Sequence, residues 1–391
     1  MAKLPWHNEL TAALAERKAA GRYRQNRLRV GEQGVHIHLG DKTILSFCSN
    51  DYLGLAAHPD IKQAFKEAVD KEGVGSGAAH LLTGHSYYHQ ALEEKLADFT
   101  GQQRVLLFST GYMANLGVID GLLTRGDAVI QDKWNHASLL DGGRLTDADQ
   151  LRYPHADMGL LHKRLHNAAT AKHRLIVSDG VFSMDGDIAS LPEIMALSEQ
   201  HHAAVLIDDA HGFGVIGEGG RGTVSHFQIT PNKAPSVVGT LGKAIGSGGA
   251  FVAADELVIE TLIQQARSYV YTTAQPPAIA AATLASLELV ETEQWRRDKL
   301  QQLIQQFRQG AEQLGLELMS SETPIQPVII GEDKKALEIG AKLEEQGILV
   351  GVIRPPTVPK NTARLRITFS AAHTEQDVDR LLVALEQAYA H

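Results

Sequence analysis

The chain contains 391 residues, enough for two or three domains or for one large α/β domain with appendages. Hydrophobic residues make up 43% of the chain and charged residues 21%, a composition typical of a globular protein and not of a disordered one. The formal net charge of −9 argues against a broad nucleic-acid-binding surface, and the single cysteine, Cys48, excludes an internal disulfide framework and a multi-cysteine metal site.

The first segment, residues 1–45, is predicted to form an amphipathic helix followed by a basic run. Apolar residues recur near helical spacing from Leu10 to Ala20, and Lys and Arg cluster from Arg17 to Arg29. Such a run usually forms a solvated surface; alternatively, it anchors an anionic substrate. Because the start lacks the apolar core of a signal peptide and no stretch is long enough to span a bilayer, we expect a cytoplasmic protein without membrane contact.

Residues 46–290 alternate between short apolar runs and helical segments, as in a large α/β domain. The predicted strands are Arg104–Phe108, Ala128–Ile130, Arg174–Val177, Ala204–Ile207 and Ser236–Val238. The predicted helices between them are 113–123, 137–141 and 191–202. This order predicts a mostly parallel sheet covered by helices on both faces, in which ligands bind at the carboxyl ends of the strands.

Residues 291–391 have a different pattern and are predicted to form a small α+β domain beside the large one. Helices are predicted over 291–314, over 334–345 and after Thr374. Strands are predicted over Ile325–Ile330, Ile348–Ile353 and Arg364–Phe369.

Residues with complementary chemistry follow two neighbouring predicted strands. Asp208 and His211 follow one strand, and Lys243 follows the next, an interval that suits one step between parallel strands. A partly desolvated lysine amine can form a Schiff base, and a carboxylate can keep a pyridine nitrogen protonated. Taken alone, Lys243 would be interpreted as a surface lysine and Asp208 as an ordinary acid at the end of a strand. Together with the adjacent glycines, they predict a site for pyridoxal 5'-phosphate on Lys243.

Two further strand ends carry candidate cofactor contacts. The segment from Ser109 to Gly111 leads from a strand into a helix, whose free amide groups could hold a phosphate, although a plain capped turn explains these residues equally well. His136 follows another strand and could stack on the cofactor ring. With 18 histidines in the chain, an ordinary loop histidine is a serious alternative.

Three other motifs do not have the context that their usual functions need. The glycines of 212–217 do not precede a helix, and Gly242–Lys243 lacks the remaining residues of a P-loop. His85 and His89 lack the glutamate of a zinc protease; a metal hydrolase built on this pair is a rival interpretation, but we expect no metal. Cys48 lies in an apolar run and is expected to pack and not to act as a nucleophile.

Four segments resemble the signature blocks of the α-oxoamine synthases, which are fold-type I, aspartate aminotransferase-like, pyridoxal-phosphate-dependent acyltransferases. These segments are Ser49–Leu55 (SNDYLGL), Asp179–Asp187 (DGVFSMDGD), Asp208–Gly212 (DDAHG) and Gly239–Lys243 (GTLGK). Within this family, Ile353–Pro359 (IRPPTVP) is most similar to the branch that acts in biotin biosynthesis.

The resemblance implies a role for each matching residue. The implied catalytic residues are Lys243, which carries the cofactor and acts as the base, Asp208 at the ring nitrogen, His211 at the phenolic oxygen and His136 stacked on the ring. The further implied cofactor contacts are Gly111, Tyr112, Ser183, Thr240 and, from the partner subunit, Thr272 and Thr273. The implied substrate contacts are Arg24, Asn50, His136, Thr357 and Arg366. Asp179 and His80 depart from the residues that the family more often carries at these positions.

The implied reaction is the decarboxylative condensation of L-alanine with a pimeloyl thioester through a cofactor quinonoid, in a homodimer with shared active sites. Coenzyme A and an acyl-carrier protein are both open as carriers of the pimeloyl group. A sister synthase, such as a glycine C-acetyltransferase or a 5-aminolevulinate synthase, is a rival that the segment 353–359 disfavours. A relative that binds the cofactor without catalysis is disfavoured by the complete set of Asp208, His211, Lys243 and Arg366.

Overall fold

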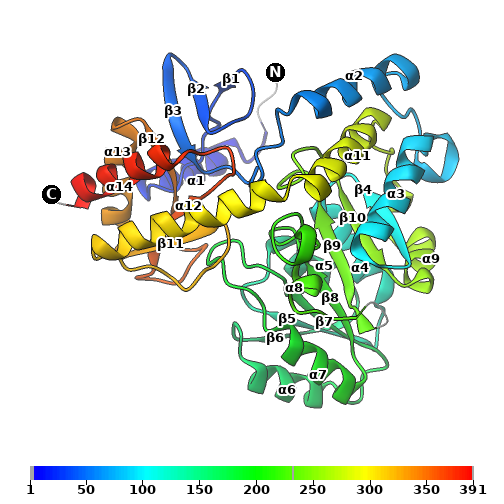
Figure 1. Ribbon diagram of the computed structural model, residues 1–391. Coiled ribbons are helices and arrows are strands. Elements are labelled where there is room, and N and C mark those ends of the chain that lie inside the picture. The colour runs from blue at the N-terminus through cyan, green and yellow to red at the C-terminus, as the bar shows by residue number, and fades with distance from the viewer. Residues whose placement is uncertain (1–3, 231–232, 390–391) are drawn as a thin grey trace.

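A computed structural model describes residues 4–230 and 233–389 of the chain. The chain forms two lobes, each built around its own β-sheet (Figure 1). Helix α11 (Pro277–Thr292) belongs to the larger lobe, and helix α12 (Gln294–Gln313) continues from it along the smaller lobe.

The sheet of the larger lobe has seven strands in the order β4-β10-β9-β8-β7-β5-β6. Their bounds are Arg104–Phe108 (β4), Ala128–Asp132 (β5), Asp149–Tyr153 (β6), Arg174–Asp179 (β7), Ala204–Asp208 (β8), Ser236–Thr240 (β9) and Ala250–Ala254 (β10). All neighbours are parallel except β10, which is antiparallel to both β4 and β9. The predicted mostly parallel sheet is therefore confirmed, and all five predicted strands lie in it.

Two strands of this sheet were not predicted. Strand β6 has the sequence DQLRY, which is too polar to be recognised as a buried run, and β10 has the sequence AFVAA, in which alanine favours helix as much as strand. Both are strands because their neighbours in the sheet supply the hydrogen bonds.

The sheet separates two layers of helices. In β4, Leu106 and Phe108 point into the hydrophobic cluster under α4 and α9, whereas Val105 and Leu107 point into the cluster under α3 and α11, because side chains alternate between the faces of a strand. The bounds of the helices around this sheet are Pro59–Glu72 (α2), Tyr87–Thr100 (α3), Gly111–Leu122 (α4), Ala137–Leu145 (α5), Met158–Asn167 (α6), Leu191–His201 (α7), Thr223–His226 (α8), Glu256–Gln265 (α9) and Arg267–Val270 (α10).

The smaller lobe combines residues from both ends of the chain. Its sheet has the order β1-β2-β3-β12-β13-β11, and β3 pairs in parallel with β12 across about three hundred residues of sequence. The bounds are Arg29–Val30 (β1), His36–Leu39 (β2), Lys42–Phe47 (β3), Ile325–Gly331 (β11), Ile348–Ile353 (β12) and Ala363–Thr368 (β13), with helices Asp333–Glu345 (α13) and Glu375–Tyr389 (α14) beside them.

Residues 29–45, which were predicted to continue the basic N-terminal segment, contribute strands to this sheet. Strand β2 alternates exposed and buried residues over only four positions, which is too short a pattern to indicate a strand by itself. Its place in the sheet is determined by pairing with β3, which in turn lies against the C-terminal strand β12.

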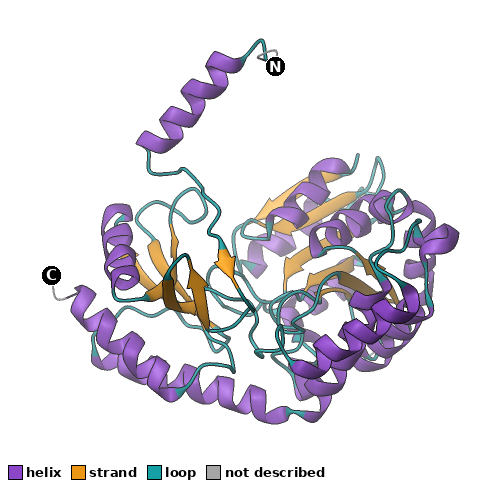
Figure 2. Cartoon of the chain, turned by 90° about the horizontal axis from the view of Figure 1, so that it is seen from above, coloured by secondary structure: helices purple, strands orange, loops and turns teal. Residues whose placement is uncertain are grey.

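The N-terminal helix forms but does not pack. Helix α1 (His7–Ala19) has no buried residue, and it projects from the body of the molecule (Figure 2). The amphipathic face expected from Leu10 to Ala20 therefore covers nothing within this chain, and the basic residues after it are exposed. Within the described residues, every helix is too short or too polar to cross a membrane.

One buried histidine joins the two ends of the chain and makes stability depend on pH. The His373 ring stacks on Phe47 at 4.3 Å, its Nδ1 accepts the backbone N–H of Ser370, and its Nε2 donates to the carbonyl of Ser46. Burial lowers the pKa of His373 to about 4. The unfolded chain, with its ordinary histidine pKa, therefore binds more protons than the folded protein between about pH 6.5 and that lower value.

We therefore expect the free energy of unfolding to decrease by about 2 kcal/mol from His373 alone between about pH 7 and pH 5. Urea unfolding at both pH values, on the wild type and on His373→Gln, measures this difference. The variant is less stable overall but should show a smaller change with pH. An equal change in both proteins would contradict the prediction.

Candidate active site

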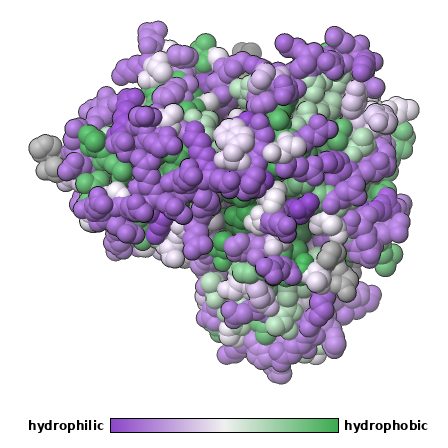
Figure 3. Space-filling model, viewed as in Figure 1, coloured by the Kyte–Doolittle hydropathy of each residue, from purple (hydrophilic) through white to green (hydrophobic). Residues whose placement is uncertain are grey.

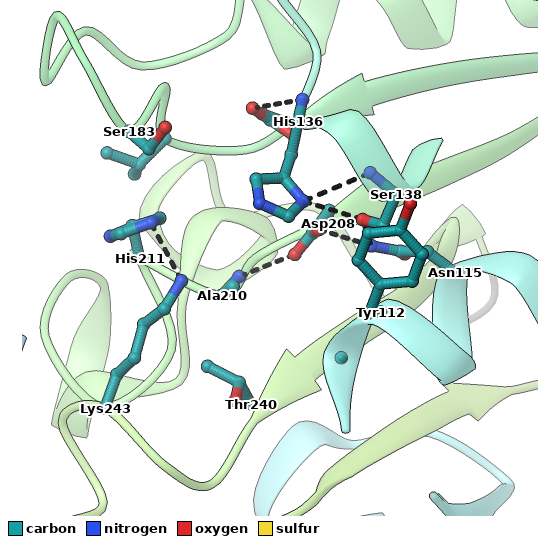
Figure 4. Close-up of a pocket in the computed structure, with 13 residues that line it drawn as sticks. Tyr112, Asn115, His136, Ser138, Ser183, Asp208, Ala210, His211, Thr240 and Lys243 are labelled. Carbon is teal, nitrogen blue, oxygen red and sulfur yellow. Dashed lines mark hydrogen bonds between the residues drawn. The ribbon is translucent and has the colours of Figure 1, made fainter. Parts of the chain in front are cut away.

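A cavity lies at the carboxyl ends of the parallel strands of the larger sheet (Figure 4). Asp208 ends β8, Thr240 ends β9 and Asp179 ends β7, so neighbouring strands deliver their side chains to one place. The cavity is lined by Gly111, Tyr112, Asn115, His136, Ser138, Asp179, Val181, Ser183, Asp208, Ala210, His211, Thr240 and Lys243. The predicted convergence of Asp208 and Lys243 on one crevice is therefore confirmed.

Asp208 is a buried carboxylate held by two donors. Its Oδ2 accepts a hydrogen bond of 2.6 Å from the Asn115 side chain, and its Oδ1 accepts one of 3.0 Å from the backbone N–H of Ala210. The same Asn115 amide donates to the Ser138 hydroxyl. Only 6% of Asp208 is exposed, so its orientation toward the cavity is fixed by these partners.

Lys243 lies in the turn after β9, and its Nζ is 2.8 Å from Nε2 of His211 (Figure 4). Burial lowers the pKa of Lys243 to about 8, although Asp208 and Asp179 oppose this shift. The amine is therefore much closer to its neutral, nucleophilic form than an exposed lysine.

A chain of hydrogen bonds continues from Lys243 to the smaller lobe. Burial and the Lys243 cation hold the pKa of His211 well below its usual range, so the ring is neutral and accepts at Nε2. Its Nδ1 then donates to the hydroxyl of Tyr52 at 2.7 Å, and Tyr52 donates to Oδ1 of Asn50 at 3.2 Å. Asn50 also accepts from Arg366 at 3.4 Å.

His136 forms the wall opposite Lys243 in Figure 4. It precedes α5, its Nδ1 is 2.7 Å from the Ser138 hydroxyl, and its backbone N–H donates to the Asp179 carboxylate. Burial lowers the pKa of His136, and burial together with the nearby Asp208 raises the pKa of Asp179 well above its usual range. The imidazole is therefore neutral and held in one orientation, with its ring free to stack on a flat ligand.

The smaller lobe contributes a cation to the edge of the site. Arg366 lies on β13, its Nε donates to the Ser183 carbonyl at 2.6 Å, and 9% of the residue is exposed. Ser183 itself lines the cavity. Arg366 is therefore placed next to the cavity, where it can hold a carboxylate.

Several predicted contacts lie outside this cavity. Thr357 lines a second cavity that shares Ser183 with the first. Arg24 is exposed on the N-terminal segment, and Thr272 and Thr273 lie in the loop before α11, away from the cavity of their own chain. Their roles stay predictions.

Four site residues were missed as candidate contacts. Asn115 donates a hydrogen bond to Asp208, and the Ser138 hydroxyl contacts His136. Tyr52 accepts a hydrogen bond from His211. Asp179, which accepts from the backbone of His136, was noted only as a departure from the family pattern. Tyr52 lies within the recognised block 49–55, which could have identified it. No spacing rule links Asn115 to an acid in β8, because the contact depends on the packing of α4 against the sheet.

A Tyr52→Phe variant tests the hydrogen-bond chain. It leaves the buried Nδ1–H of His211 without its acceptor, so we expect a loss of about 1 to 3 kcal/mol in the free energy of unfolding and a fall of roughly tenfold in kcat. Thermal unfolding and steady-state kinetics measure both, with Tyr87→Phe on the exposed start of α3 as the matched control. If Tyr52→Phe kept the stability and the kcat of the wild type, this series of hydrogen bonds would have no role in either.

The histidines near α3 form a cluster outside this cavity. His80, His85 and His89 offer nitrogen atoms within 4.8 Å of one another, a spacing that could hold a metal ion. His80 and His85 are joined through their Nδ1 atoms at 2.9 Å, while His89 accepts from the N–H of Ser86 and donates to the carbonyl of Gln275. Because His89 already uses both nitrogens, the cluster anchors the loop before α11. The expected absence of a metal stays a prediction.

Cys48 is partly buried, and its Sγ donates to the carbonyl of Leu349 at 3.4 Å. Burial raises the pKa of Cys48 to about 12, so the thiolate that a nucleophile needs is scarce. This agrees with the prediction that Cys48 packs.

The residues around the cavity fit pyridoxal phosphate. A buried acid, an activated lysine and a neutral histidine wall surround a space that a flat ring can enter. The start of α4, at Gly111 and Tyr112, presents backbone amides to the cavity, which suits a phosphate.

Comparison with known proteins shows what the chain is similar to. Residues 42–385 match the family model of class I and II aminotransferases. A curated 8-amino-7-oxononanoate synthase from Nitrosococcus oceani is 58% identical over 374 residues, which cover 96% of this chain and 99% of that protein.

Two solved structures are similar to the whole fold. A serine palmitoyltransferase with a PLP internal aldimine has a TM-score of 0.92 and 30% sequence identity, covering 99% of both chains. An 8-amino-7-oxononanoate synthase from Francisella tularensis has a TM-score of 0.78 and 32% identity, covering 89% of this chain and 98% of that one. The predicted fold-type I architecture is thereby confirmed.

Proposed function

Because this chain belongs to the class I and II aminotransferases and, within them, to the family of the 8-amino-7-oxononanoate synthases, we propose that it joins L-alanine to a pimeloyl thioester. The reaction forms a bond between the alanine Cα and the acyl carbon, and it releases the thiol and carbon dioxide. The product, 8-amino-7-oxononanoate, is an intermediate of biotin biosynthesis. The observation that carries this proposal is the 58% identity over 96% of the chain.

The enzyme depends on pyridoxal phosphate. We propose that Lys243 binds it covalently, Asp208 pairs with its ring nitrogen, His211 faces its phenolic oxygen and His136 stacks on its ring. The start of α4, Ser183 and Thr240 would complete the contacts. When bound, the cofactor supplies an electron sink for the pair left on the amino acid Cα after its proton is removed.

The chain's own groups then position the substrates and move the proton. Arg366, with Asn50, would hold the carboxylate of alanine and so orient its Cα–H bond toward Lys243; the contact between Arg366 and Asn50 supports this role. Since burial favours the neutral amine, Nζ of Lys243 can take the Cα proton and return it after carbon dioxide has left. Thr357 would contact the acyl substrate from the second cavity, and Arg24 would contact substrate from the N-terminal segment.

We further propose that the protein is a cytoplasmic homodimer with shared active sites. Thr272 and Thr273 lie outside the cavity of their own chain, so a role at the cofactor phosphate requires that they reach the partner's cavity. The unpacked helix α1, which carries Leu10 and Leu14 exposed, is consistent with a partner surface. Sedimentation analysis of the purified protein measures the assembly.

Product analysis tests the proposed function. L-alanine and glycine are each incubated with pimeloyl-CoA, with a pimeloyl-acyl-carrier protein and with acetyl-CoA, and the aminoketones are identified by mass spectrometry. We expect product from alanine with a pimeloyl donor; the two carriers show which donor is used. Preferential use of glycine with acetyl-CoA would instead indicate a glycine C-acetyltransferase.

A further inference from the structure

A second cavity of about 520 Å³ opens beside the active site and shares Ser183 with it. Its size lies within the range of small-molecule sites in proteins. It is lined by Lys133, Trp134, Asn135, Ala137, Leu140, Phe182, Ser183, Met184, Asp185, Pro356, Thr357, Val358 and Pro359. Two segments of this lining, within 133–140 and 182–185, come from the larger lobe, and the third, 356–359, comes from the smaller lobe. Apolar residues also gather where the two lobes meet on the face drawn in Figure 3.

Two aromatic side chains of the cavity wall contact the same partly buried histidine. Trp134 stacks on His155 at 4.1 Å, and Phe182 meets the edge of the same ring at 4.4 Å. His155 lies between the carboxylates of Asp132 and Asp187, which raise its pKa to about 9 against the effect of burial. The ring is therefore a fixed cation that keeps both aromatic walls in one orientation.

The charged residues of the wall are Lys133 and Asp185, and they differ in their surroundings. Asp185 is 4% exposed and forms an ion pair with Arg364. Lys133 follows the end of β5, and its backbone N–H donates to the carbonyl of Tyr153. Among the residues that the structure describes, Lys133 has no carboxylate within ion-pair distance. The cavity therefore combines aromatic and proline side chains with polar groups, and Lys133, an exposed residue of its wall, is free to bind an anion.

We propose that this cavity receives the carbon chain of the acyl thioester and that Lys133 binds the carboxylate at its far end. This inference rests on the proposed function, which requires a pimeloyl group, a five-methylene chain ending in a carboxylate. The methylenes match the aromatic and proline walls, and the terminal charge matches Lys133. Lys133 is then a specificity residue: it distinguishes a dicarboxylic acyl group from an ordinary fatty acyl group of equal length.

The test compares two acyl donors that differ at the far end alone. Pimeloyl-CoA and heptanoyl-CoA have the same number of carbons and the same carrier, but heptanoyl ends in a methyl group. Values of kcat/KM with L-alanine are measured for the wild type, Lys133→Gln and Lys133→Arg, with Lys163→Gln on the exposed face of α6 as the control. Thermal unfolding checks that each variant is folded.

We expect Lys133→Gln to lower the preference for pimeloyl-CoA over heptanoyl-CoA by roughly tenfold or more, mainly through KM, since a hydrogen bond to a charged group is lost. Lys133→Arg should retain most of the preference, and Lys163→Gln all of it. An equal loss of kcat/KM with both donors would mean that Lys133 binds the coenzyme phosphates, and it would overturn the inference.

An unchanged preference in Lys133→Gln would overturn the inference and leave the proposed function intact. Failure of the wild type to form any aminoketone from pimeloyl-CoA or a pimeloyl-acyl-carrier protein would overturn the proposed function, and this inference with it.

Discussion

The Lys243→Ala variant is expected to lose turnover by about four orders of magnitude or more. The substitution removes the covalent link to the cofactor and the amine that moves the Cα proton, and general acid–base catalysis alone contributes up to about 10⁴-fold. Among the described residues, no other amine lines the cavity, so no second lysine can form the covalent link. Turnover of L-alanine with pimeloyl-CoA measures the loss.

Two further measurements separate a chemical loss from a structural one. Exchange of the alanine Cα proton with deuterated water, followed by NMR without an acyl donor, isolates proton removal and should stop in Lys243→Ala. The visible absorbance that borohydride bleaches in the wild type should also disappear. Lys163→Ala, on the exposed face of α6, should retain all of these signals. Cα exchange at the wild-type rate in Lys243→Ala would refute the role of this amine.

The Asp208→Asn variant is expected to lower both Cα exchange and turnover by roughly 10³-fold. An amide has nearly the same shape as the carboxylate, but it cannot stabilise a positive charge on the ring nitrogen. Loss of one preorganised electrostatic contact typically costs 10² to 10³-fold in rate. The substitution also places an amide against the donating side chain of Asn115, which adds to the effect.

The adjacent acid provides a matched control. Asp209 is also buried, but it accepts hydrogen bonds from the backbone and hydroxyl of Thr223 and does not line the cavity. Burial raises the pKa of Asp209 to about 7, and its carboxyl group faces Thr223 and not the cavity. Asp209→Asn should lower stability by about 1 to 2 kcal/mol while retaining Cα exchange within a few-fold. Equal losses of exchange in the two variants would contradict the role assigned to Asp208.

Much of the active site could be predicted because its residues follow local patterns. The central strands are short apolar runs; Asp208 ends one of them, and Lys243 and His136 lie in the turns that follow two others. Once the strands are recognised as parallel, their carboxyl ends must lie at one edge of the sheet. The strands with polar or alanine-rich sequences, β6 and β10, could not be recognised, because their pairing partners decide their conformation.

The sequence by itself determined the chemistry of this protein: a lysine and an acid after neighbouring parallel strands, within blocks that identify a pyridoxal-phosphate enzyme. These signals are local, since each block of residues occupies one turn at the end of one strand. Only the tertiary structure decided what surrounds that chemistry.

The tertiary structure pairs the N-terminal strand β3 with β12, brings Arg366 to Asn50 and places Tyr52 against His211. It also places Lys133 in the wall of the second cavity, together with residues 356–359 of the smaller lobe. These contacts join residues far apart in sequence. They depend on how the two lobes pack, which no periodicity within a single segment encodes.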